Sequence, residues 1–247
     1  MNALILAAGL GTRLGELTSD RPKALVEVAG HTMLEYQIRR LQAAGFDRIA
    51  VNVHHFADKI VRFLQDNGNF GAEISVSDES GLLLDTGGGI RKAFHLFTDD
   101  APLLVHNVDI FSTTDLRALY DSHRTGGADV TLLAADRITS RYLHFDDSMR
   151  LRGWSNCKSG EIRSPFPDFD ITRCRRLAFQ GIHVLSRSVL PMLNSIGSER
   201  FSITDFYVDS AAALDIRAVC ARNGKWVDAG KPEALETAAE IVSGVVS

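Results

Sequence analysis

Hydrophobic and polar residues follow one another along this chain in blocks that predict alternating strands and helices. Short apolar runs of strand length cover residues 4–6, 47–53, 72–76, 101–109, 128–134, 177–185 and 216–220. Between them, apolar residues recur at helical spacing, as in a helix that begins near Met33 and is closed by Gly45. Strands that alternate with helices form parallel sheets with right-handed crossovers. We therefore expect an α/β fold with a doubly wound, mostly parallel (mixed) sheet of Rossmann-like type.

The pattern loosens in the second half of the chain. Residues 141–145 and 149–154 have the alternation of a hairpin, and residues 155–174 contain two prolines and little periodicity, which predicts a loop. The cations of this region are Lys158, Arg163, Arg173, Arg175 and Arg176. A solvated basic surface explains them more simply than contact with a sugar phosphate. Gly181 lies inside the following strand, where a glycine often marks the close approach of a ligand or of another backbone.

The first strand ends in a loop that is suited to bind phosphate. Gly9 and Gly11 let the backbone turn tightly, and successive N–H groups in such a turn form a nest for anions. Arg13 follows two residues later, and Lys23 comes after a proline. The loop is not a dinucleotide fingerprint, because Leu14 stands where the third glycine is required, and it lacks the Gly-Lys-Ser/Thr of a Walker loop. An ordinary glycine turn with two surface cations is the alternative explanation.

A second glycine run, Gly87–Gly89, leads into a later helix. Three consecutive glycines cost backbone entropy, so a purely structural turn would rarely use them. They leave a surface without side chains, which a planar base or a ribose can approach closely. A permissive turn is the alternative explanation.

A carboxylate stands at the end of the apolar strand 101–109. Ligands of open α/β sheets bind beyond the carboxyl ends of the strands, so Asp109 is a candidate for the site. Its alternative role is to cap the helix that begins near Thr113 or Thr114.

Composition excludes several classes of partner. The chain has 247 residues, of which 45% are hydrophobic and 23% charged, as in ordinary globular proteins. Its net charge of −4 argues against a nucleic-acid or anionic-membrane surface, and no apolar run approaches membrane-spanning length. Cys157, Cys174 and Cys220 are widely spaced, which indicates reduced thiols, and the N-terminus lacks the pattern of a signal peptide. We expect a cytoplasmic monomer or homodimer with no nucleic-acid or membrane partner.

The order and spacing of these motifs resemble those of sugar nucleotidyltransferases, the nucleoside-diphosphate-sugar pyrophosphorylases. Gly-x-Gly-x-Arg and then Pro-Lys follow an N-terminal Leu-Ala-Ala strand, and Trp226 opens a Trp-x-Asp-x-Gly-x-Pro-Glu segment. The string Asp-Thr-Gly-Gly-Gly-Ile, which begins at Asp85, is similar to the Glu-Thr-Gly-Gly-Gly-Ile of N-acetylmuramate-1-phosphate uridylyltransferases. The resemblance implies nucleotidyl transfer from an NTP to a sugar 1-phosphate, giving an NDP-sugar and pyrophosphate. It favours UTP with N-acetylmuramate 1-phosphate, and GTP with mannose or heptose 1-phosphate is the near alternative.

The resemblance also implies roles for individual residues. Lys23 would neutralise the α-phosphate, Arg13 would hold the leaving pyrophosphate, and Asp109 and Asp228 would bind Mg²⁺. The residues expected to contact the nucleotide are Ala7, Ala8, Gly9, Gly11, Thr12, Arg13, Lys23, Thr86, Gly87, Gly88 and Asn107. The residues expected to contact the sugar are Gly181 and Asp205.

The chain departs from the family pattern at two points. Val108 stands where relatives usually carry glycine, and a valine there should crowd a ligand beside Asp109. The Glu-Lys-Pro segment that supplies a second lysine in many relatives is missing, so the cation for the acceptor phosphate is unassigned. A non-catalytic sugar-nucleotide-sensing domain is the alternative of another class. Such a domain could dispense with Lys23, Asp109 and Asp228, so their presence favours catalysis.

The expected organisation is a single nucleotidyltransferase domain over residues 1–247. Its nucleotide-binding part covers about residues 1–135, and a small sugar-binding subdomain covers about residues 136–220. A C-terminal segment, residues 221–247, carries the second metal ligand and the last helix.

Overall fold

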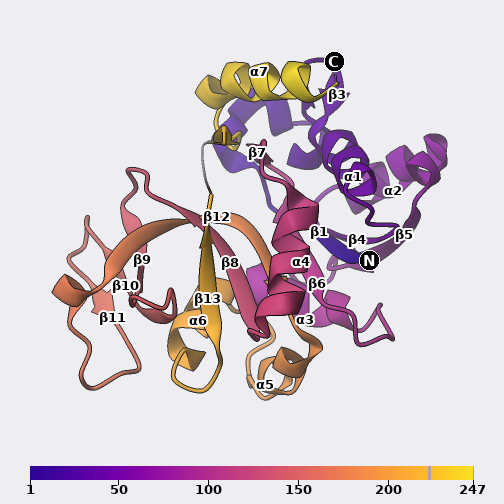
Figure 1. Ribbon diagram of the computed structural model, residues 1–247. Coiled ribbons are helices and arrows are strands. Elements are labelled where there is room, and N and C mark those ends of the chain that lie inside the picture. Colours follow the sequence, from indigo (N-terminus) through magenta and orange to yellow (C-terminus); the bar gives the residue numbers. More distant parts are fainter. Residues whose placement is uncertain (222–223, 247) are drawn as a thin grey trace.

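The apolar runs of the first part of the chain form the parallel half of a central sheet. The computed structural model describes residues 1–221 and 224–246 (Figure 1). The parallel strands, in their order across the sheet, are β6 (Leu103–Asn107), β1 (Asn2–Leu6), β4 (Arg48–Val53) and β5 (Glu73–Asp78). Because Leu6 pairs with both Asn52 and Asn107, the carboxyl ends of β1, β4 and β6 meet at one edge. Ligands of such sheets bind at this edge.

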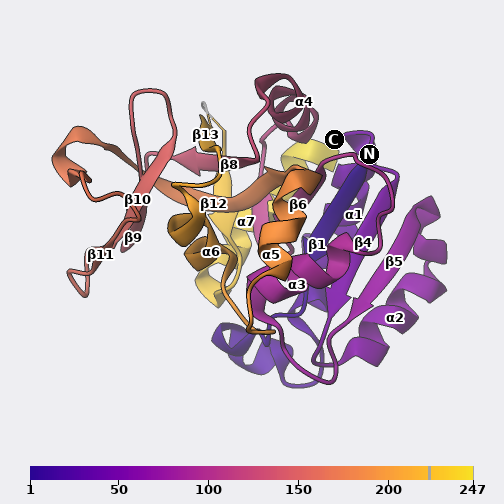
Figure 2. The same ribbon diagram turned by 90° about the horizontal axis from the view of Figure 1, so that it is seen from below.

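Helices cover both faces of the sheet because successive side chains of a strand point to opposite faces. Ala3 and Ile5 of β1 join one buried cluster, and Leu4 joins the other. The helices that pack into the first cluster are α1 (Met33–Ala43), α2 (Ala57–Asp66), α4 (Leu116–Gly126) and α7 (Leu235–Val246). Those that pack into the second are α3 (Asp85–Phe94), α5 (Leu190–Asn194) and α6 (Ile203–Ser210). Figure 2 shows α3 lying across β1 and β4.

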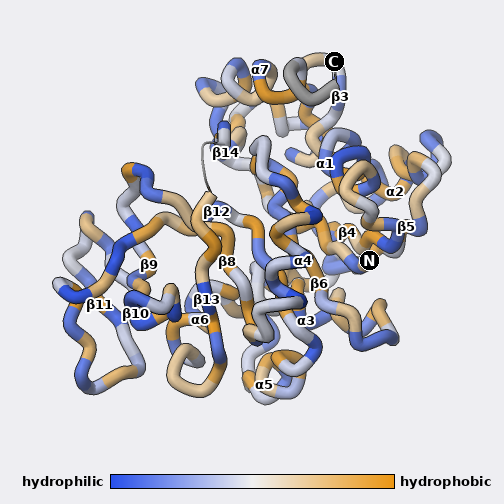
Figure 3. The backbone as a smooth tube through the Cα atoms, in the orientation of Figure 1, coloured by the Kyte–Doolittle hydropathy of each residue, from blue (hydrophilic) through white to orange (hydrophobic). Residues whose placement is uncertain are grey.

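A long strand, β12 (Arg175–Leu185), joins this half of the sheet to a second lobe. Its last residues pair antiparallel with β6 and β8, and its first residues pair with β9. The remaining strands of the sheet are β8 (Val130–Ala135), β9 (Arg141–Phe145), β10 (Leu151–Asn156), β11 (Ile162–Arg163) and β13 (Ile216–Cys220). Figure 3 shows hydrophobic residues along β12 and hydrophilic stretches around β10 and β11. The sheet is therefore mixed, and within the described residues it contains ten strands.

Two short ribbons lie outside this sheet. β7 (Ile110–Ser112) pairs antiparallel with β14 (Trp226–Asp228), and β2 (Glu27–Val28) pairs with β3 (His31–Thr32). The 3₁₀ turns are Thr12–Thr18, Lys23–Leu25, Gly68–Gly71, Ile171–Arg173, Arg187–Val189 and Pro232–Ala234. Residues 222–223 and 247 of the expected C-terminal segment lie outside the described residues. No helix in the described part of the chain is long and apolar enough to cross a membrane.

The expected fold class is confirmed, and one local expectation needs correction. Before β2, hydrogen bonds of the i→i+3 type make Lys23–Leu25 a 3₁₀ turn. Gly87–Gly89 do not precede a helix but lie within the first turns of α3. After β12, a 3₁₀ turn, Arg187–Val189, leads directly into the short α5.

Candidate active site

An asparagine of the neighbouring strand holds the end of β1. The Oδ1 atom of Asn52, a residue only 3% exposed, accepts hydrogen bonds from the N–H groups of Ala7 at 2.6 Å and Ala8 at 3.2 Å. Its Nδ2 atom donates to Glu79 at 2.7 Å, and this buried carboxylate also accepts the Leu84 N–H at 3.1 Å. Protein groups therefore occupy the first two N–H groups of the loop, and its exposed part begins at Gly9.

Gly11 allows the segment of Lys23 to pack against the loop. Gly11 has a φ of +69°, and a Cβ atom there would lie 2.9 Å from Cβ of Lys23 and 3.0 Å from Cγ2 of Thr18. Thr18 also donates a hydrogen bond to the Gly11 carbonyl at 3.1 Å. Thr12 begins the exposed 3₁₀ turn that carries Arg13.

The β7–β14 ribbon brings together the two carboxylates that the sequence places far apart. Asp228 stands opposite Ile110 in this ribbon, and the Ala229 N–H donates to the Asp109 carbonyl at 2.9 Å. The alternative role of Asp109 as a helix cap is not realised, because Asp115 caps α4 by accepting the Ala118 N–H at 2.9 Å.

Two cations meet the carboxylate pair. The ammonium group of Lys23 forms an ion pair with Asp109, and both side chains are 12% exposed. The guanidinium of Arg13 lies 3.5 Å from Asp228 and 3.9 Å from Asp109. A Cβ atom at Gly230 would lie 2.4 Å from Nη2 of Arg13, so a glycine at this position lets the guanidinium approach.

The carboxylates differ in their electrostatic environments. Burial raises the pKa of Asp109, the nearby Asp228 carboxylate raises it further, and Lys23 opposes both effects. Burial would also raise the pKa of Asp228, but the Gly230 N–H and Arg13 outweigh this effect and lower it. Two neighbouring carboxylates repel each other unless a cation lies between them.

This pair fits a magnesium ion. Mg²⁺ is usually bound by one or two carboxylates, with phosphate oxygens and waters completing its octahedron. No group of three or more His, Cys, Asp or Glu side chains in the described residues could hold a metal by itself. An ion bound by Asp109 and Asp228 would therefore take its other ligands from substrate phosphates and water.

Two cavities that share lining residues lie near this cluster, and Lys23 and Asp109 line the first of them. One, of about 290 Å³, lies at the carboxyl edge of the parallel strands; the candidate residues that line it are Ala8, Gly9, Lys23, Thr86, Asn107 and Asp109. The other, of about 650 Å³, lies between the main sheet and the second lobe, and Asp85 and Thr86 line both. We call the first the nucleotide cavity and the second the acceptor cavity.

The glycine run packs against residues 199–201 on the side where a side chain would project. A Cβ atom at Gly87 would lie 2.3 Å from the Phe201 ring, and one at Gly88 would lie 2.2 Å from the Glu199 carbonyl. The Gly87 N–H donates to the Phe201 carbonyl at 2.9 Å. The glycines therefore let α3 pack tightly against residues 199–201, and among the predicted residues of this run only Thr86 lines the cavities.

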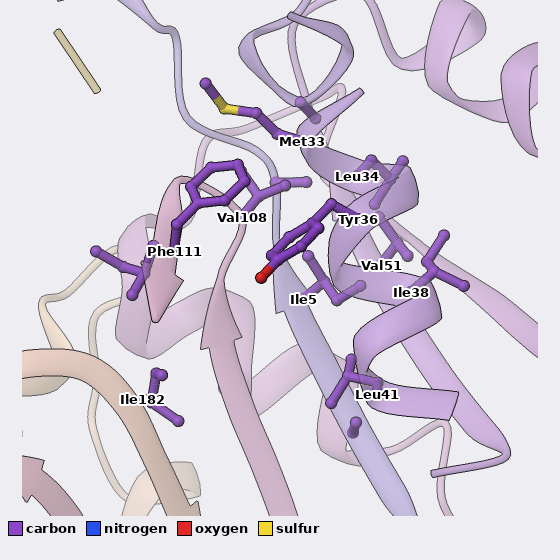
Figure 4. Close-up of a cluster of buried hydrophobic side chains, with 14 of the residues drawn as sticks. Ile5, Met33, Leu34, Tyr36, Ile38, Leu41, Val51, Val108, Phe111 and Ile182 are labelled. Carbon is purple, nitrogen blue, oxygen red and sulfur yellow. The ribbon is translucent and has the colours of Figure 1, made fainter. Parts of the chain in front are cut away.

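Val108 lies beside Asp109 in the lining of the nucleotide cavity, where the sequence predicted that it would crowd a ligand. It is only 3% exposed and belongs to a buried cluster. Figure 4 shows it beside Phe111 and Tyr36, whose rings stack with centroids 4.9 Å apart. Val108 therefore contributes to the buried core as well as to the cavity wall, and its effect on a ligand stays a prediction.

The two residues expected to contact sugar have other neighbours in the structure. Gly181 is buried with a φ of +71°, and a Cβ atom there would lie 2.9 Å from Nδ2 of Asn107, so backbone conformation and packing account for this glycine. Asp205 does line the acceptor cavity, but it is paired with Arg163 at 2.6 Å.

Sequence reasoning missed three polar residues at the site. Asn52 and Glu79 link the loop after β1 to the start of α3, and Arg137 lines the acceptor cavity. A polar residue between Val51 and Val53, near the end of an apolar strand, was the available signal for Asn52. Arg137 gave no comparable signal, because it lies in an irregular segment.

Comparisons with known proteins identify the family of the chain. Residues 3–163 match the family of the MobA-like NTP transferase domain. The chain is 33% identical over 242 residues to an N-acetylmuramate alpha-1-phosphate uridylyltransferase of Caulobacter vibrioides, which covers 94% of this chain and 93% of that protein. It is 34% identical over 137 residues to a mannose-1-phosphate guanyltransferase of Hypocrea jecorina, covering 54% of this chain and 37% of that protein.

A solved structure supports the fold. The structure of a putative glucose-1-phosphate thymidylyltransferase from Bacillus anthracis, in complex with a sucrose, superposes with a TM-score of 0.80. The alignment covers 98% of this chain and 95% of that chain at 16% sequence identity. At that identity, the similarity is evidence for the fold alone.

Proposed function

This chain belongs to the family of MobA-like NTP transferase domains, and we propose on that premise that it transfers a uridylyl group from UTP to N-acetylmuramate 1-phosphate. One observation carries the proposal. Lys23 and Arg13 meet Asp109 and Asp228, and two members of this cluster, Lys23 and Asp109, line the nucleotide cavity. A second, larger cavity shares Asp85 and Thr86 with the nucleotide cavity. The similarity to the Caulobacter vibrioides protein over nearly the whole of both chains favours this pair of substrates.

The reaction needs little proton chemistry from the protein. An oxygen of the acceptor phosphate attacks the α-phosphorus, the bond from that phosphorus to the β-bridging oxygen breaks, and pyrophosphate leaves with the electron pair. A phosphate monoester has a second pKa of about 6, so the nucleophile is already ionised near neutral pH. The barrier is electrostatic, because two polyanions must approach each other, and fixed cations lower it.

The cations have distinct positions for this task. Lys23, held by Asp109 beside the nucleotide cavity, neutralises the α-phosphate. Arg13, on the loop that begins at Gly9, binds the leaving pyrophosphate together with the exposed backbone of that loop. Asp109 and Asp228 would hold a Mg²⁺ ion, which would supply positive charge to the phosphate oxygens. We propose that the contacts to nucleotide come from Gly9, Thr12, Thr86 and Asn107, and that Gly11 supports the loop.

The organisation and location of the protein follow from the same proposal. Residues 1–135 bind the nucleotide, and residues 136–220 form most of the acceptor cavity. Cys157, Cys174 and Cys220 are free thiols, which suits a cytoplasmic enzyme. We propose a monomer or homodimer.

A matrix of four NTPs against a panel of sugar 1-phosphates, with Mg²⁺, tests the activity. Released pyrophosphate should be highest for UTP with N-acetylmuramate 1-phosphate. Highest turnover with GTP and mannose 1-phosphate would instead support the activity named for the Hypocrea jecorina protein. No turnover with any pair would favour a sensing domain.

Substitution of the central lysine tests the mechanism. Lys23→Ala should lower pyrophosphate release by about 100-fold or more, because a hydrogen-bonding charge at the transition state is worth about 2.7–4 kcal/mol. Lys92→Ala is the matched control, since Lys92 lies in the last turn of α3 and bonds the Asp78 carbonyl. Turnover of Lys23→Ala equal to that of Lys92→Ala would remove Lys23 from the mechanism.

A further inference from the structure

An arginine without a carboxylate partner lines the acceptor cavity. Arg137 lies just after β8 and is half-buried. Its guanidinium carbon lies 4.0 Å from the centroid of the Trp226 ring, and Nη2 donates to the Phe179 carbonyl at 3.1 Å. Its Nε atom is buried and lacks a hydrogen-bond partner among the described residues. No carboxylate of those residues lies within 4.0 Å of its guanidinium, so a charged group with hydrogen-bonding capacity is fixed in place there.

The position of Arg137 relates it to the carboxylate pair. Trp226, on which it stacks, precedes Asp228 by two residues in β14. The negative charge of Asp228 also acts on Arg137: burial lowers the pKa of this arginine, and Asp228 raises it. Arg13 reaches Asp228 from the phosphate-binding loop, whereas Arg137 reaches the same region from the acceptor cavity.

Other arginines near the cavities lack this combination. Arg163 is engaged by Asp205 at 2.6 Å and by Asp209 at 2.9 Å. Arg141 also lines the acceptor cavity but is exposed, and Arg200 lines the nucleotide cavity instead. A half-buried guanidinium has lost part of its hydration. A doubly charged oxyanion, which the planar guanidinium can bind through two hydrogen bonds, replaces the lost interactions with water most effectively.

We propose that Arg137 binds the 1-phosphate of the acceptor sugar and holds it for attack on the α-phosphorus. The proposal rests on the proposed nucleotidyl transfer. It supplies the cation for the acceptor phosphate that the sequence, without a Glu-Lys-Pro segment, left unassigned. Stacking on Trp226 and the bond to Phe179 fix the guanidinium before the sugar binds, so that little side-chain entropy is lost on binding.

Steady-state kinetics of Arg137→Gln test this role. Loss of a charged hydrogen-bonding group should lower kcat/KM for the sugar 1-phosphate by about 10- to 100-fold, since such bonds are worth about 1.5–3 kcal/mol. The KM for UTP should stay within about twofold, because Arg137 does not line the nucleotide cavity. Arg137→Lys keeps the charge and should recover part of the loss. An unchanged kcat/KM for the acceptor, or an equal loss for UTP and acceptor, would overturn the proposal.

A matched arginine controls for lost packing. Arg152 also stacks on an aromatic ring, with its guanidinium carbon 3.6 Å from the Phe166 centroid, and it pairs with Asp168 away from both cavities. Arg152→Gln should leave both KM values unchanged. A loss of acceptor kcat/KM in Arg152→Gln equal to that in Arg137→Gln would show a general packing effect and refute the proposed contact.

Direct binding separates this proposal from the proposed activity. Calorimetry should show that wild-type protein binds N-acetylmuramate 1-phosphate more tightly than free N-acetylmuramate, and that Arg137→Gln loses this preference. An Arg137-dependent preference without pyrophosphate release would support the contact and refute the transfer reaction. Turnover with a preference that persists in Arg137→Gln, or the lack of any preference in wild type, would refute the contact.

Discussion

At the scale of single residues, Asn52 connects features of the site that are far apart in the sequence. Its carboxamide accepts the N–H groups of Ala7 and Ala8 and donates to Glu79, which in turn accepts the Leu84 N–H. Burial raises the pKa of Glu79, and its bonds to Asn52 and Leu84 favour the charged form. The loop after β1 and the start of α3 are therefore held in one hydrogen-bonded unit.

Removing this link should weaken nucleotide binding. Asn52→Ala leaves two backbone N–H groups and a carboxylate without their partner, which should cost about 1–3 kcal/mol of unfolding free energy for each buried group left unpaired. We expect the KM for UTP to rise about 10-fold by loss of preorganisation, with a smaller effect on the acceptor KM.

Two measurements separate positioning from stability. Urea unfolding gives the change in stability, and initial rates at varied UTP give the KM. Asn67→Ala is the control, because Asn67 caps the end of α2 at the surface. If the Asn52→Ala protein is destabilised but keeps the wild-type KM for UTP, Asn52 contributes to folding alone.

At the scale of elements, α3 illustrates how a glycine run serves packing. The first turns of this helix lie against residues 199–201, and a Cβ atom at Gly88 would lie 2.2 Å from the Glu199 carbonyl and 2.9 Å from Leu84. Backbone atoms cannot move aside as a flexible side chain can. Asp85, with a φ of +59°, enters the helix in a conformation that is uncommon for a non-glycine residue.

Gly88→Ala should therefore destabilise the protein. Overpacking of a buried contact costs about 1–3 kcal/mol, which outweighs the gain of up to about 1 kcal/mol from replacing a helical glycine by alanine. Gly126→Ala in α4 is the matched control, because no atom lies within 4 Å of the added methyl group, and it should be neutral or stabilising. Equal unfolding free energies of the two variants, measured by urea denaturation, would contradict this account.

The pairing of β7 with β14 is the second decisive arrangement of elements. β7 continues from the turn that carries Asp109, and β14 ends at Asp228. Their antiparallel register places the two carboxylates together although 119 positions (228 − 109) separate them in the chain. The same ribbon presents Trp226 to Arg137, which lines the acceptor cavity.

At the scale of the whole molecule, buried histidines couple stability to pH. His183 is 1% exposed, stacks on Phe179 and is faced by Tyr207 and His106. Burial lowers the pKa of His183 from 6.5 to about 3 and that of His106 to about 3. Between these pH values the unfolded chain binds more protons than the folded protein, so stability rises with pH and is lost as the pH falls below 6.5.

His183→Leu should reduce this dependence. Each proton that is taken up on unfolding contributes a slope of about 1.4 kcal/mol per pH unit to the unfolding free energy. Between pH 6 and pH 4, the slope of the variant should be smaller than that of wild type by up to this amount. Urea unfolding at a series of pH values measures the slope, which is independent of any constant change in stability. A slope equal to that of wild type would show that His183 takes up no proton on unfolding.

The sequence was sufficient where the relevant physics is local. Apolar periodicity predicted the parallel strands, α1 and the hairpin of β9 and β10, because burial on one face requires a regular spacing. The resemblance carried by Gly9, Gly11, Arg13 and Lys23 agreed with the family match. Short motifs of this kind specify their own turns and charges, so they can be recognised without the rest of the chain.

Only the tertiary structure decided which distant residues meet. The register of β7 on β14 joins Asp228 to Asp109, the end of β4 brings Asn52 to the loop, and the lobe after β8 places Arg137 against Trp226. It also placed protein atoms close to Gly88 and Gly181, where the sequence had predicted only ligand contact. These relations depend on strand order and on the contact of surfaces far apart in the chain. No local pattern of residues specifies such contacts. For that reason the sequence determined the glycine and cation motifs of the loop after β1, while the fold determined which distant residues meet them.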